Sequence, residues 1–322
     1  MALLGLLLLT FMIGRVMPLD PVLAIVGPDA DRATYEQVHK QLGLDRPLWV
    51  QFGRYLGDLV QGDLGRALLT GRPVTEDLAR VLPATVELAT LAIVLGALLG
   101  VPLGVWAASH HKRWPDHVAR IVGLAGHSTP VFWFGMMGLL VFYAWLGWAG
   151  GIGRIGLGFE GAIPRVTGLM LIDTLLAGDT AAFRSALRHL LLPACVLGLH
   201  SMAYLSRMTR SFMLAQLSQE YITTARVKGL SRRRVVWGHA FLNIRVQLLT
   251  ILALAYGGLL EGAVLVETVF GWPGFGSYLT GSLLLGDMNA VMGSVLVIGL
   301  LFVALNLTAD ALYRVFDPRA RA

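Results

Sequence analysis

The fold of this chain is decided by the apolar run from Ala84 to Ser109, which reads ATVELATLAIVLGALLGVPLGVWAAS and holds one ionisable residue, Glu87. A helix needs about 20 apolar residues to cross the hydrocarbon core of a bilayer, which is roughly 30 Å thick. Gly96, Gly100 and Gly104 recur at four-residue spacing, so a helix would present them as one stripe on which a second helix can pack closely. The run therefore predicts a membrane-spanning helix that packs against a neighbour.

The rest of the chain repeats this apolar pattern. Its 322 residues are 56% hydrophobic and only 14% charged, whereas a soluble domain carries about a quarter charged residues. Open sheets would leave backbone groups unpaired in lipid, and a barrel would need strands of alternating polarity. The sequence therefore predicts an all-α polytopic membrane protein with six transmembrane helices. The other five spans are expected at Ala2–Met17, Val118–Leu146, Leu190–Leu205, Val246–Val269 and Ala290–Ala309.

The first of these runs, Ala2–Met17, has two interpretations. A cleaved signal peptide would have a basic start and a small-residue cleavage site. No Lys or Arg precedes Arg15, and Met17-Pro-Leu-Asp20 is a poor cleavage site. We therefore expect a retained first span, although its sixteen residues rise only about 24 Å as a helix.

Lys and Arg residues concentrate in three segments that would share one face of the membrane. Segment 206–245 holds eight of them against one acid, Glu220, while 110–117 holds two and 314–322 holds three. The positive-inside rule places such segments in the cytoplasm, so both termini are expected there, in a multi-pass protein of the bacterial inner membrane. The same rule accounts for the net charge of +6 without a nucleic-acid partner.

The intervening segments are expected on the outer side, because their charges nearly balance. Residues 18–83 hold seven Lys or Arg and nine Asp or Glu, and short amphipathic helices are predicted at Thr34–Leu42 and Pro47–Val60. This predicts a small helical periplasmic segment between the first two spans. The expected parts are 1–83 (first span and periplasmic subdomain), 84–313 (transmembrane domain with the cytoplasmic loop 206–245) and 314–322 (cytoplasmic tail).

The basic segment contains a stretch with its own local structure, LSQEYITTARVKGLSRRRVV at Leu217–Val236. Good helix formers fill Glu220–Lys228, and Gly229 stands where a left-handed residue would end that helix. Ser231 can cap a second helix that starts at Arg232. The pattern predicts two short helices with a break between them.

One face of the first short helix would carry Tyr221, Ile222, Ala225 and Gly229. A large aromatic beside small residues suits insertion into a cleft on a partner protein. The competing interpretation is a solvated basic loop that only fixes topology, but such a loop needs no capped, Gly-terminated helix. The residues alone leave both interpretations open.

The stretch Glu220-Tyr-Ile-Thr-Thr-Ala-Arg-Val-Lys-Gly229 resembles the EAA signature of binding-protein-dependent ABC importer permeases. Ser128–Trp133 and Leu171–Thr174 resemble the first, B-type, permease subunit of dipeptide importers. Six further segments occur in the order found in the peptide, nickel and glutathione importers: Met17–Pro21, Leu42–Leu48, Gln61–Gly65, Leu82–Leu88, Val269–Gly276 and Asp317–Arg319. The resemblance thus covers nearly the whole chain.

This resemblance implies a type I ABC importer transmembrane fold and a permease that moves dipeptides or oligopeptides by alternating access, with glutathione or nickel as alternatives. It implies a second, homologous permease, two ATPase subunits that bind ATP and Mg, a solute-binding protein and contact with membrane lipid. We expect no cofactor in this chain and no enzymatic activity, because no Gly-x-x-x-x-Gly-Lys-Ser/Thr loop occurs. The single cysteine, Cys195, permits no cysteine-based metal site and is expected as a small core residue.

The resemblance also implies a site at which the short helix couples to an ATPase subunit. Two positions depart from the family pattern: Thr223-Thr224-Ala225 replaces the usual Glu-Ala-Ala, and Val246-Gln247 replaces a Leu-Pro. Relatives also carry a basic stretch before the first span, so a start upstream of Met1 or a truncation is a hypothesis. The expected coupling residues are Glu220, Tyr221, Thr223, Thr224, Ala225 and Gly229.

Ionisable residues within spans are costly in lipid and are therefore functional candidates. Glu261 and Glu267 are six residues apart and so lie on different faces of one helix. We predict that Glu267, with Trp272 and Pro273, lines the translocation path or forms an outer gate. The other candidates are expected near span ends (Glu87, Asp310) or bonded to a neighbouring helix (His127, His200).

Two rival functions are less well supported by the sequence. An intramembrane hydrolase would use Ser128 with His127 or His200, but adjacent Ser and His side chains diverge on a helix and no acidic partner is apparent. A channel or transporter that works without ATP would leave the capped cytoplasmic helix unexplained.

Overall fold

The computed structural model describes residues 2–16, 21–27, 29–41 and 43–316. These residues form helices and connecting loops, and the only β pairing among them is an isolated bridge between Arg66 and Pro73. The all-α prediction is confirmed. The tail from Asp317 onward, with its Asp317–Arg319 motif, lies outside the described residues, as do Leu42 and most of the Met17–Pro21 segment.

The chain forms two compact units, and each is described by itself. Unit 1 comprises Met1–Pro83 and Pro273–Val303, and unit 2 comprises Ala84–Trp272 and Ala304–Ala322. The predicted transmembrane domain, 84–313, included residues 273–303, which the structure groups with unit 1. The predicted domain boundaries stay predictions.

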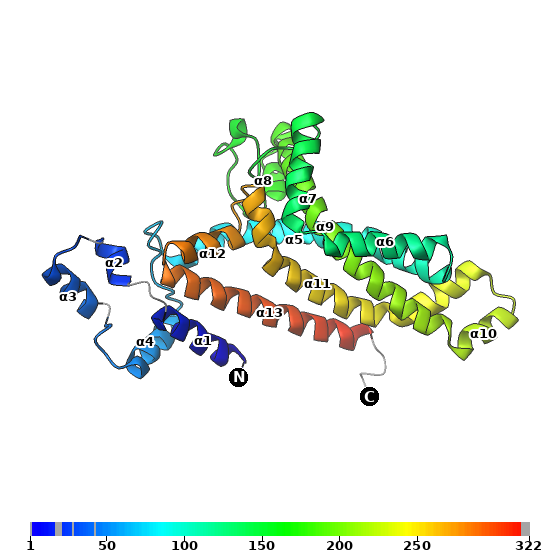
Figure 1. The fold of residues 1–322 in the computed structure, drawn as a ribbon, viewed down its shortest axis with the longest axis horizontal. Coiled ribbons are helices and arrows are strands. Elements are labelled where there is room, and N and C mark those ends of the chain that lie inside the picture. The colour runs from blue at the N-terminus through cyan, green and yellow to red at the C-terminus, as the bar shows by residue number, and fades with distance from the viewer. Residues whose placement is uncertain (1, 17–20, 28, 42, 317–322) are drawn as a thin grey trace. The chain divides into compact units, whose positions relative to one another are not determined.

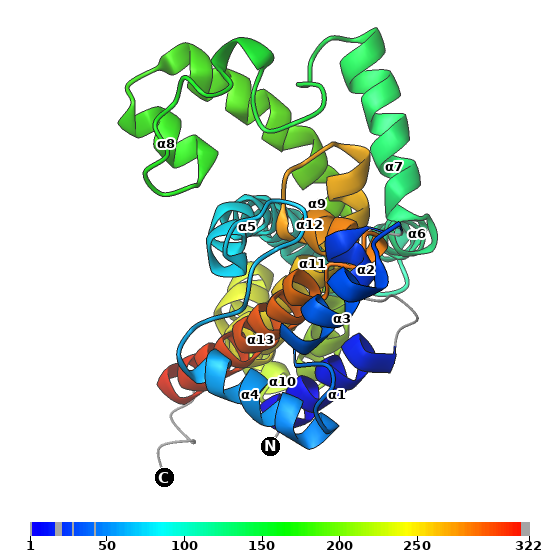
Figure 2. The same cartoon turned by 90° about the vertical axis from the view of Figure 1, so that its left-hand side faces the viewer.

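Unit 1 holds the short helices expected in the segment 18–83. The predicted helices at 34–42 and 47–60 are present as α3 and α4 (Figures 1 and 2). Phe52 and Tyr55 of α4 pack on Phe11 of α1, with ring centroids 5.2 and 5.9 Å apart. The helices of unit 1 are α1 (Ala2–Val16), α2 (Pro21–Val26), α3 (Arg32–Gln41), α4 (Leu48–Val60), the first part of α5 (Val74–Ser109), α12 (Phe275–Leu284) and most of α13 (Met288–Phe316).

In unit 2, α9 packs against α11, α6, α8 and α7, and α5 approaches it closely at its glycines. A Cβ placed on Gly96 or Gly100 would lie 2.0 Å from Ser201 Oγ or 2.7 Å from the Met202 carbonyl oxygen, so only glycine permits this approach. The predicted small-residue stripe is thereby confirmed as a packing surface. The remaining elements are α6 (Trp114–Ser128), α7 (Val131–Gly138), η1 (Leu139–Trp145), η2 (Leu157–Phe159), α8 (Met170–Leu176), α9 (Thr180–Leu217), α10 (Glu220–Val227), η3 (Arg234–Ala240) and α11 (Phe241–Val269).

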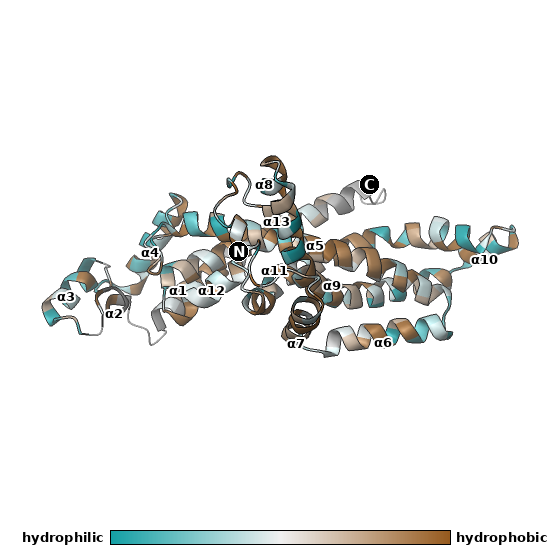
Figure 3. Ribbon diagram, turned by 90° about the horizontal axis from the view of Figure 1, so that it is seen from above, coloured by the Kyte–Doolittle hydropathy of each residue, from teal (hydrophilic) through white to brown (hydrophobic). Residues whose placement is uncertain are grey.

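The predicted third span, Val118–Leu146, is not one straight helix. It divides into α6 and the run from α7 through η1, which are bent by 92° (Figure 1). Thr129 is extended, with φ −88° and ψ 130°, because a residue before proline is forced out of the helical region and Pro130 has no N–H to donate. The α7 segment is strongly apolar, as Figure 3 shows.

Among the residues that the structure describes, four helices are long and apolar enough to cross a membrane, at Val74–Ser109, Thr180–Leu217, Arg234–Val269 and Met288–Ala309. The bent pair of α6 and α7 would be a fifth span. Helix α1 has 15 residues, which is shorter than a typical span. The fold is that of a multi-pass membrane protein, and the count of six spans stays a prediction.

Two further sequence expectations were wrong in detail. The expected loop 206–245 is largely helical, because α9 continues to Leu217 and α11 begins at Phe241, so that only the α10–η3 hairpin lies between them. Polar side chains on the exposed side of a long helix resemble a loop when only hydropathy is considered. Cys195, expected in the core, lies on the exposed side of α9.

Candidate functional site

Helix α10 ends as the sequence predicts. Gly229 has a φ of +78°, and its N–H donates to the Arg226 carbonyl at 3.0 Å while Leu230 N–H donates to the Ala225 carbonyl at 3.2 Å. These two bonds form a Schellman motif, which satisfies carbonyls that the helix end would otherwise leave open. The next helical segment starts at Arg232, and the Ser231 carbonyl accepts from Val235 N–H at 3.0 Å. The short first helix and the break after it are confirmed, but the second helix is not short, because it runs on without interruption to Val269.

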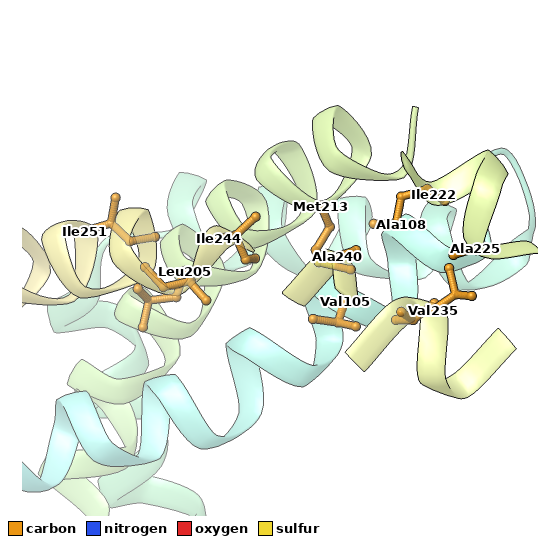
Figure 4. Close-up of a cluster of buried hydrophobic side chains, with 12 residues drawn as sticks. Val105, Ala108, Leu205, Met213, Ile222, Ala225, Val235, Ala240, Ile244 and Ile251 are labelled. Atoms are coloured by element: carbon orange, nitrogen blue, oxygen red, sulfur yellow. The ribbon is translucent and has the colours of Figure 1, made fainter. Parts of the chain in front are cut away.

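The buried side of α10 packs on its own chain. Ile222 is fully buried and Ala225 nearly so, in a cluster that includes Val105 and Ala108 of α5 and Val235 of η3 (Figure 4). The predicted insertion face is therefore wrong in part, because Ile222 and Ala225 are held by this chain's own core. That core fixes the orientation of α10.

The outward side of α10 is polar and open. It carries Glu220, Thr223, Thr224 and Gly229, all exposed, together with Val227, whose side chain is 83% exposed. No atom lies within 4 Å of a Cβ built on Gly229. This surface, the α10 outer face, contains every predicted coupling residue except Ala225 and Tyr221.

Tyr221 connects α10 to two long helices. Its hydroxyl donates to Gln216 Oε1 at the end of α9 at 2.8 Å and accepts from Asn243 Nδ2 at the start of α11 at 2.9 Å. Beyond α10, Arg232 donates to the carbonyl of Ser109, the last residue of α5. The α10 hairpin is thus attached by hydrogen bonds to α5, α9 and α11.

A second candidate region lies at the end of unit 2 that carries α8. Arg154 Nη2 donates to Glu87 Oε2 at 2.5 Å and to the Gly168 carbonyl at 3.0 Å, and Glu87 Oε1 accepts from Leu171 N–H at 2.7 Å. Both charged side chains are largely buried, being 11% and 7% exposed. The prediction that Glu87 lies near a span end stays a prediction, and the structure shows that its ion pair lies inside the protein and joins α5 to the loop before α8.

The structure brings Glu267 and Trp272 to the same region. Glu267 is fully buried and accepts from Thr85 Oγ1 at 2.5 Å. The Trp272 indole N–H donates to the Ala84 carbonyl at 3.0 Å, and the Arg154 guanidinium lies 5.6 Å from the centre of its ring, within the range of a cation–π contact. Pro273, the third predicted gate residue, is exposed and belongs to unit 1.

The remaining ionisable candidates are placed as follows. Glu261 is exposed on α11 whereas Glu267 is buried, so the prediction that they lie on different faces is confirmed. His200 is half-buried on α9. The side chains of His127 and Asp310 lie outside the described residues.

Asp173 is a site residue that the sequence interpretation missed. Its carboxylate accepts from the Thr167 N–H and hydroxyl, both at 2.7 Å, and from Gly168 N–H at 2.9 Å. Burial would raise the pKa of Asp173, but these hydrogen bonds outweigh it, and the pKa is lowered from its usual range. Asp173 thereby holds the loop whose Gly168 carbonyl accepts from Arg154. The signal available in the sequence was that Arg154 and Asp173 flank a Gly-rich loop.

Comparison with known proteins adds two family matches. The family described as "Binding-protein-dependent transport system inner membrane component" matches residues 100–322, and the N-terminal family of the same membrane component matches residues 1–89. The sequence is 44% identical, over 98% of this chain and 92% of the relative, to the "Probable D,D-dipeptide transport system permease protein DdpB" of Escherichia coli (strain K12). It is 41% identical, over 98% and 94%, to the "Di/tripeptide transport system permease protein DppB" of Pseudomonas aeruginosa (strain UCBPP-PA14).

A solved structure shares the fold. A chain of the MetNI methionine ABC transporter, in an inward-facing conformation, superposes with a TM-score of 0.56 at 15% identity, over 74% of this chain and 96% of that one.

Proposed function

This chain belongs to the family of inner membrane components of binding-protein-dependent transport systems, and we propose that it is the permease through which an ABC importer carries dipeptides or oligopeptides. It is a transport component and not an enzyme. The observation that supports the peptide cargo is the 44% identity, over 98% of the chain, to a probable D,D-dipeptide permease. ATP and Mg are bound by partner ATPase subunits, and this chain performs no covalent chemistry.

The α10 outer face is the surface that docks on an ATPase subunit. Its polar residues Glu220, Thr223 and Thr224 are exposed, while Ile222 and Ala225 hold the helix on the chain's own core. Because α10 is held firmly on this core, a partner bound to its exposed face can move the helix and the core together without changing the conformation of α10. Ala225 contributes by allowing close packing beneath that face, and Gly229 by ending the helix there.

The hydrogen bonds around α10 would carry this motion into the spans. Tyr221 links α10 to α9 and α11, and Arg232 links the following segment to α5. Helix continues from Arg232 through Val246-Gln247 to Val269, because no proline interrupts it at the position where relatives carry Leu-Pro. A displacement of α10 would therefore move α11 directly, and the path would alternate between inward-open and outward-open states.

The membrane arrangement that fits this role has six spans, with α1 as the first and the bent pair of α6 and α7 as the third. Both termini are cytoplasmic, residues 18–83 face the periplasm, and the basic α10 end faces the cytoplasm. The buried cluster of Glu267 and Trp272 then lies toward the outer side. In this conformation Glu267 is bonded to Thr85 rather than exposed, which suits a closed outer gate.

The complete importer consists of this chain, a homologous second permease, two ATPase subunits and a solute-binding protein. The experiment that tests the proposal purifies this chain with the products of its neighbouring genes and measures ATP hydrolysis in lipid. Dipeptide-loaded binding protein is expected to stimulate hydrolysis severalfold. Stimulation by glutathione or nickel and not by dipeptides would contradict the peptide substrate but not the assignment as an importer. Failure to assemble with ATPase subunits would contradict that assignment.

A further inference from the structure

A cavity of about 430 Å³ opens between α6 and α9, and the function proposed above does not use it. The two helices touch at one end of the cavity, where a Cβ on Gly126 would lie 3.1 Å from the Cβ of Ala203. At the other end they are joined by Arg210 of α9, which donates to Asp116 of α6 at 2.5 and 3.0 Å. The cavity therefore has two distinct ends within unit 2.

The walls of this cavity change from apolar to basic between those ends. On α6 the lining passes from Leu124 through Arg120 to His117, residues that share one helical face because they are three or four positions apart. On α9 it passes from Ala203 to Arg207, with Arg210 at the end. The two helices are antiparallel, so their basic residues meet at the same end, the one closer to α10.

The basic end carries uncompensated positive charge. Asp116, the acid of α6 at this end, is almost fully buried and already accepts from Arg210 and from Lys112 N–H, and it lies 3.2 Å from His111 Nδ1. Arg120 and Arg207 are exposed, and neither has an ion pair in the part of the chain that the structure describes. The Arg207 guanidinium lies 6.0 Å from the ring centre of Tyr204, which orients it beside the cavity.

The apolar end is equally open. Ile121 and Leu124 also line the cavity, and their side chains are 67% and 69% exposed. A free phosphate would gain nothing from these apolar walls. A peptide would bring an ammonium group, for which the occupied Asp116 offers no free acceptor. A purely apolar molecule would leave the arginines without a counter-ion. The remaining class of ligand is an amphiphile with an anionic head.

We propose that this cavity binds one anionic phospholipid, with its phosphate between Arg120 and Arg207 and an acyl chain along Ile121 and Leu124. Guanidinium groups bind phosphate oxygens with paired hydrogen bonds, and basic pockets between membrane helices favour acidic headgroups. The Arg210–Asp116 bridge holds α6 to α9 at the headgroup end. A lipid seated here fills the space between the two helices next to the α10 hairpin.

The proposal is tested on the assembled importer in nanodiscs of phosphatidylcholine with graded phosphatidylglycerol. Native mass spectrometry measures the phosphatidylglycerol retained per complex. The double variant Arg120→Gln with Arg207→Gln is expected to weaken retention by about thirty-fold, since each basic residue near a membrane surface contributes about fivefold. Arg120→Lys with Arg207→Lys keeps the charge and should retain most of the lipid. The matched control, Arg233→Gln with Arg234→Gln, removes two exposed charges outside the cavity and should leave this tightly retained lipid in place.

Three results would overturn the proposal. Equal retention by wild type and the Arg120/Arg207 glutamine variant would show that the lipid is held elsewhere. Displacement of the lipid by millimolar inorganic phosphate would show a simple anion site. Displacement by a dipeptide would assign the cavity to the translocation path instead. Gel filtration of each complex verifies that the variants still assemble. Lipid retention is measured without any transport assay, so the result does not depend on which substrate the importer carries.

Discussion

At the α10 end of unit 2 the apolar side chains Ile222 and Ala225 are buried and the polar ones lie outside, whereas at the end that carries α8 the charged side chains Glu87 and Arg154 are buried. The first arrangement leaves a polar surface free to engage a partner. The second fixes a loop by an ion pair whose loss would leave a charge stranded in the protein. Substitutions at the first end should therefore change transport, and those at the second should change folding.

The most severe effect is expected from Gly229→Asp at the α10 end. Aspartate and asparagine adopt a φ of +78° more readily than most residues, but aspartate also places a negative charge on the docking face. Peptide uptake is expected to be abolished while the protein level in the membrane stays normal. Gly229→Asn is the control, because asparagine tolerates this conformation without a charge, and it should keep most of the uptake. Normal uptake by the aspartate variant would refute the docking assignment.

The largest change in stability is expected from Arg154→Met at the α8 end. It leaves the buried Glu87 carboxylate unpaired, and breaking a buried pair in this way costs about 3–5 kcal/mol. The thermal unfolding midpoint of the purified importer in detergent should fall. Arg32→Met is the control, since the Arg32–Glu36 pair is exposed and its loss should leave the midpoint unchanged. Equal midpoints for both variants would show that the buried pair is not structural.

Asp173→Asn should destabilise the same loop by a smaller amount, about 1–3 kcal/mol at neutral pH. The folded pKa of Asp173 is lowered, so the carboxylate stabilises the fold above its usual value near 3.8 and loses that contribution as pH falls through the lowered pKa. The difference between the midpoints of wild type and variant should therefore be constant from pH 7 to 5 and shrink below pH 4. A difference that grows in acid would contradict the assignment.

The smallest effect is expected from Tyr221→Phe, which keeps the ring and removes one hydroxyl. The two bonds to Gln216 and Asn243 are lost, but both are exposed, so water can replace them and the net cost to folding is small. We expect a severalfold fall in peptide molecules imported per ATP hydrolysed, with little change in stability. Tyr256→Phe, which removes one hydroxyl bond between α11 and α5, should leave that ratio unchanged. If both variants changed it equally, the link through Tyr221 would have no special role.

Sequence and structure agree most closely where local chemistry decides the outcome. The end of α10 follows from Gly229 alone, and the approach of α5 to α9 follows from three glycines at fixed spacing. The break between α6 and α7 also has a local cause, Thr129-Pro130. It was not predicted because the sequence is apolar on both sides of it. Hydropathy could not distinguish the polar end of α9 from a loop.

Long-range pairings could not be predicted from the sequence. Arg154 and Glu87 are 67 residues apart, and nothing in either neighbourhood specifies the other. The same holds for Ile222, which looked available to a partner because its burial depends on residues of α5 and η3. A pattern on one helix shows which face is apolar, but the rest of the fold decides what covers that face.

The glycine contacts between α5 and α9 have a mechanical consequence. At Gly96, Gly100 and Gly104, over roughly 12 Å of helix, α5 presents no side chain, and backbone atoms of α9 lie within 3.1 Å of the position that a Cβ would take. Side chains can change rotamer and absorb a displacement, but two backbones in contact cannot. The two helices should therefore move together as one rigid body. A small tilt imposed near Ser109 and Leu217 would then produce the same tilt at the other end of this contact.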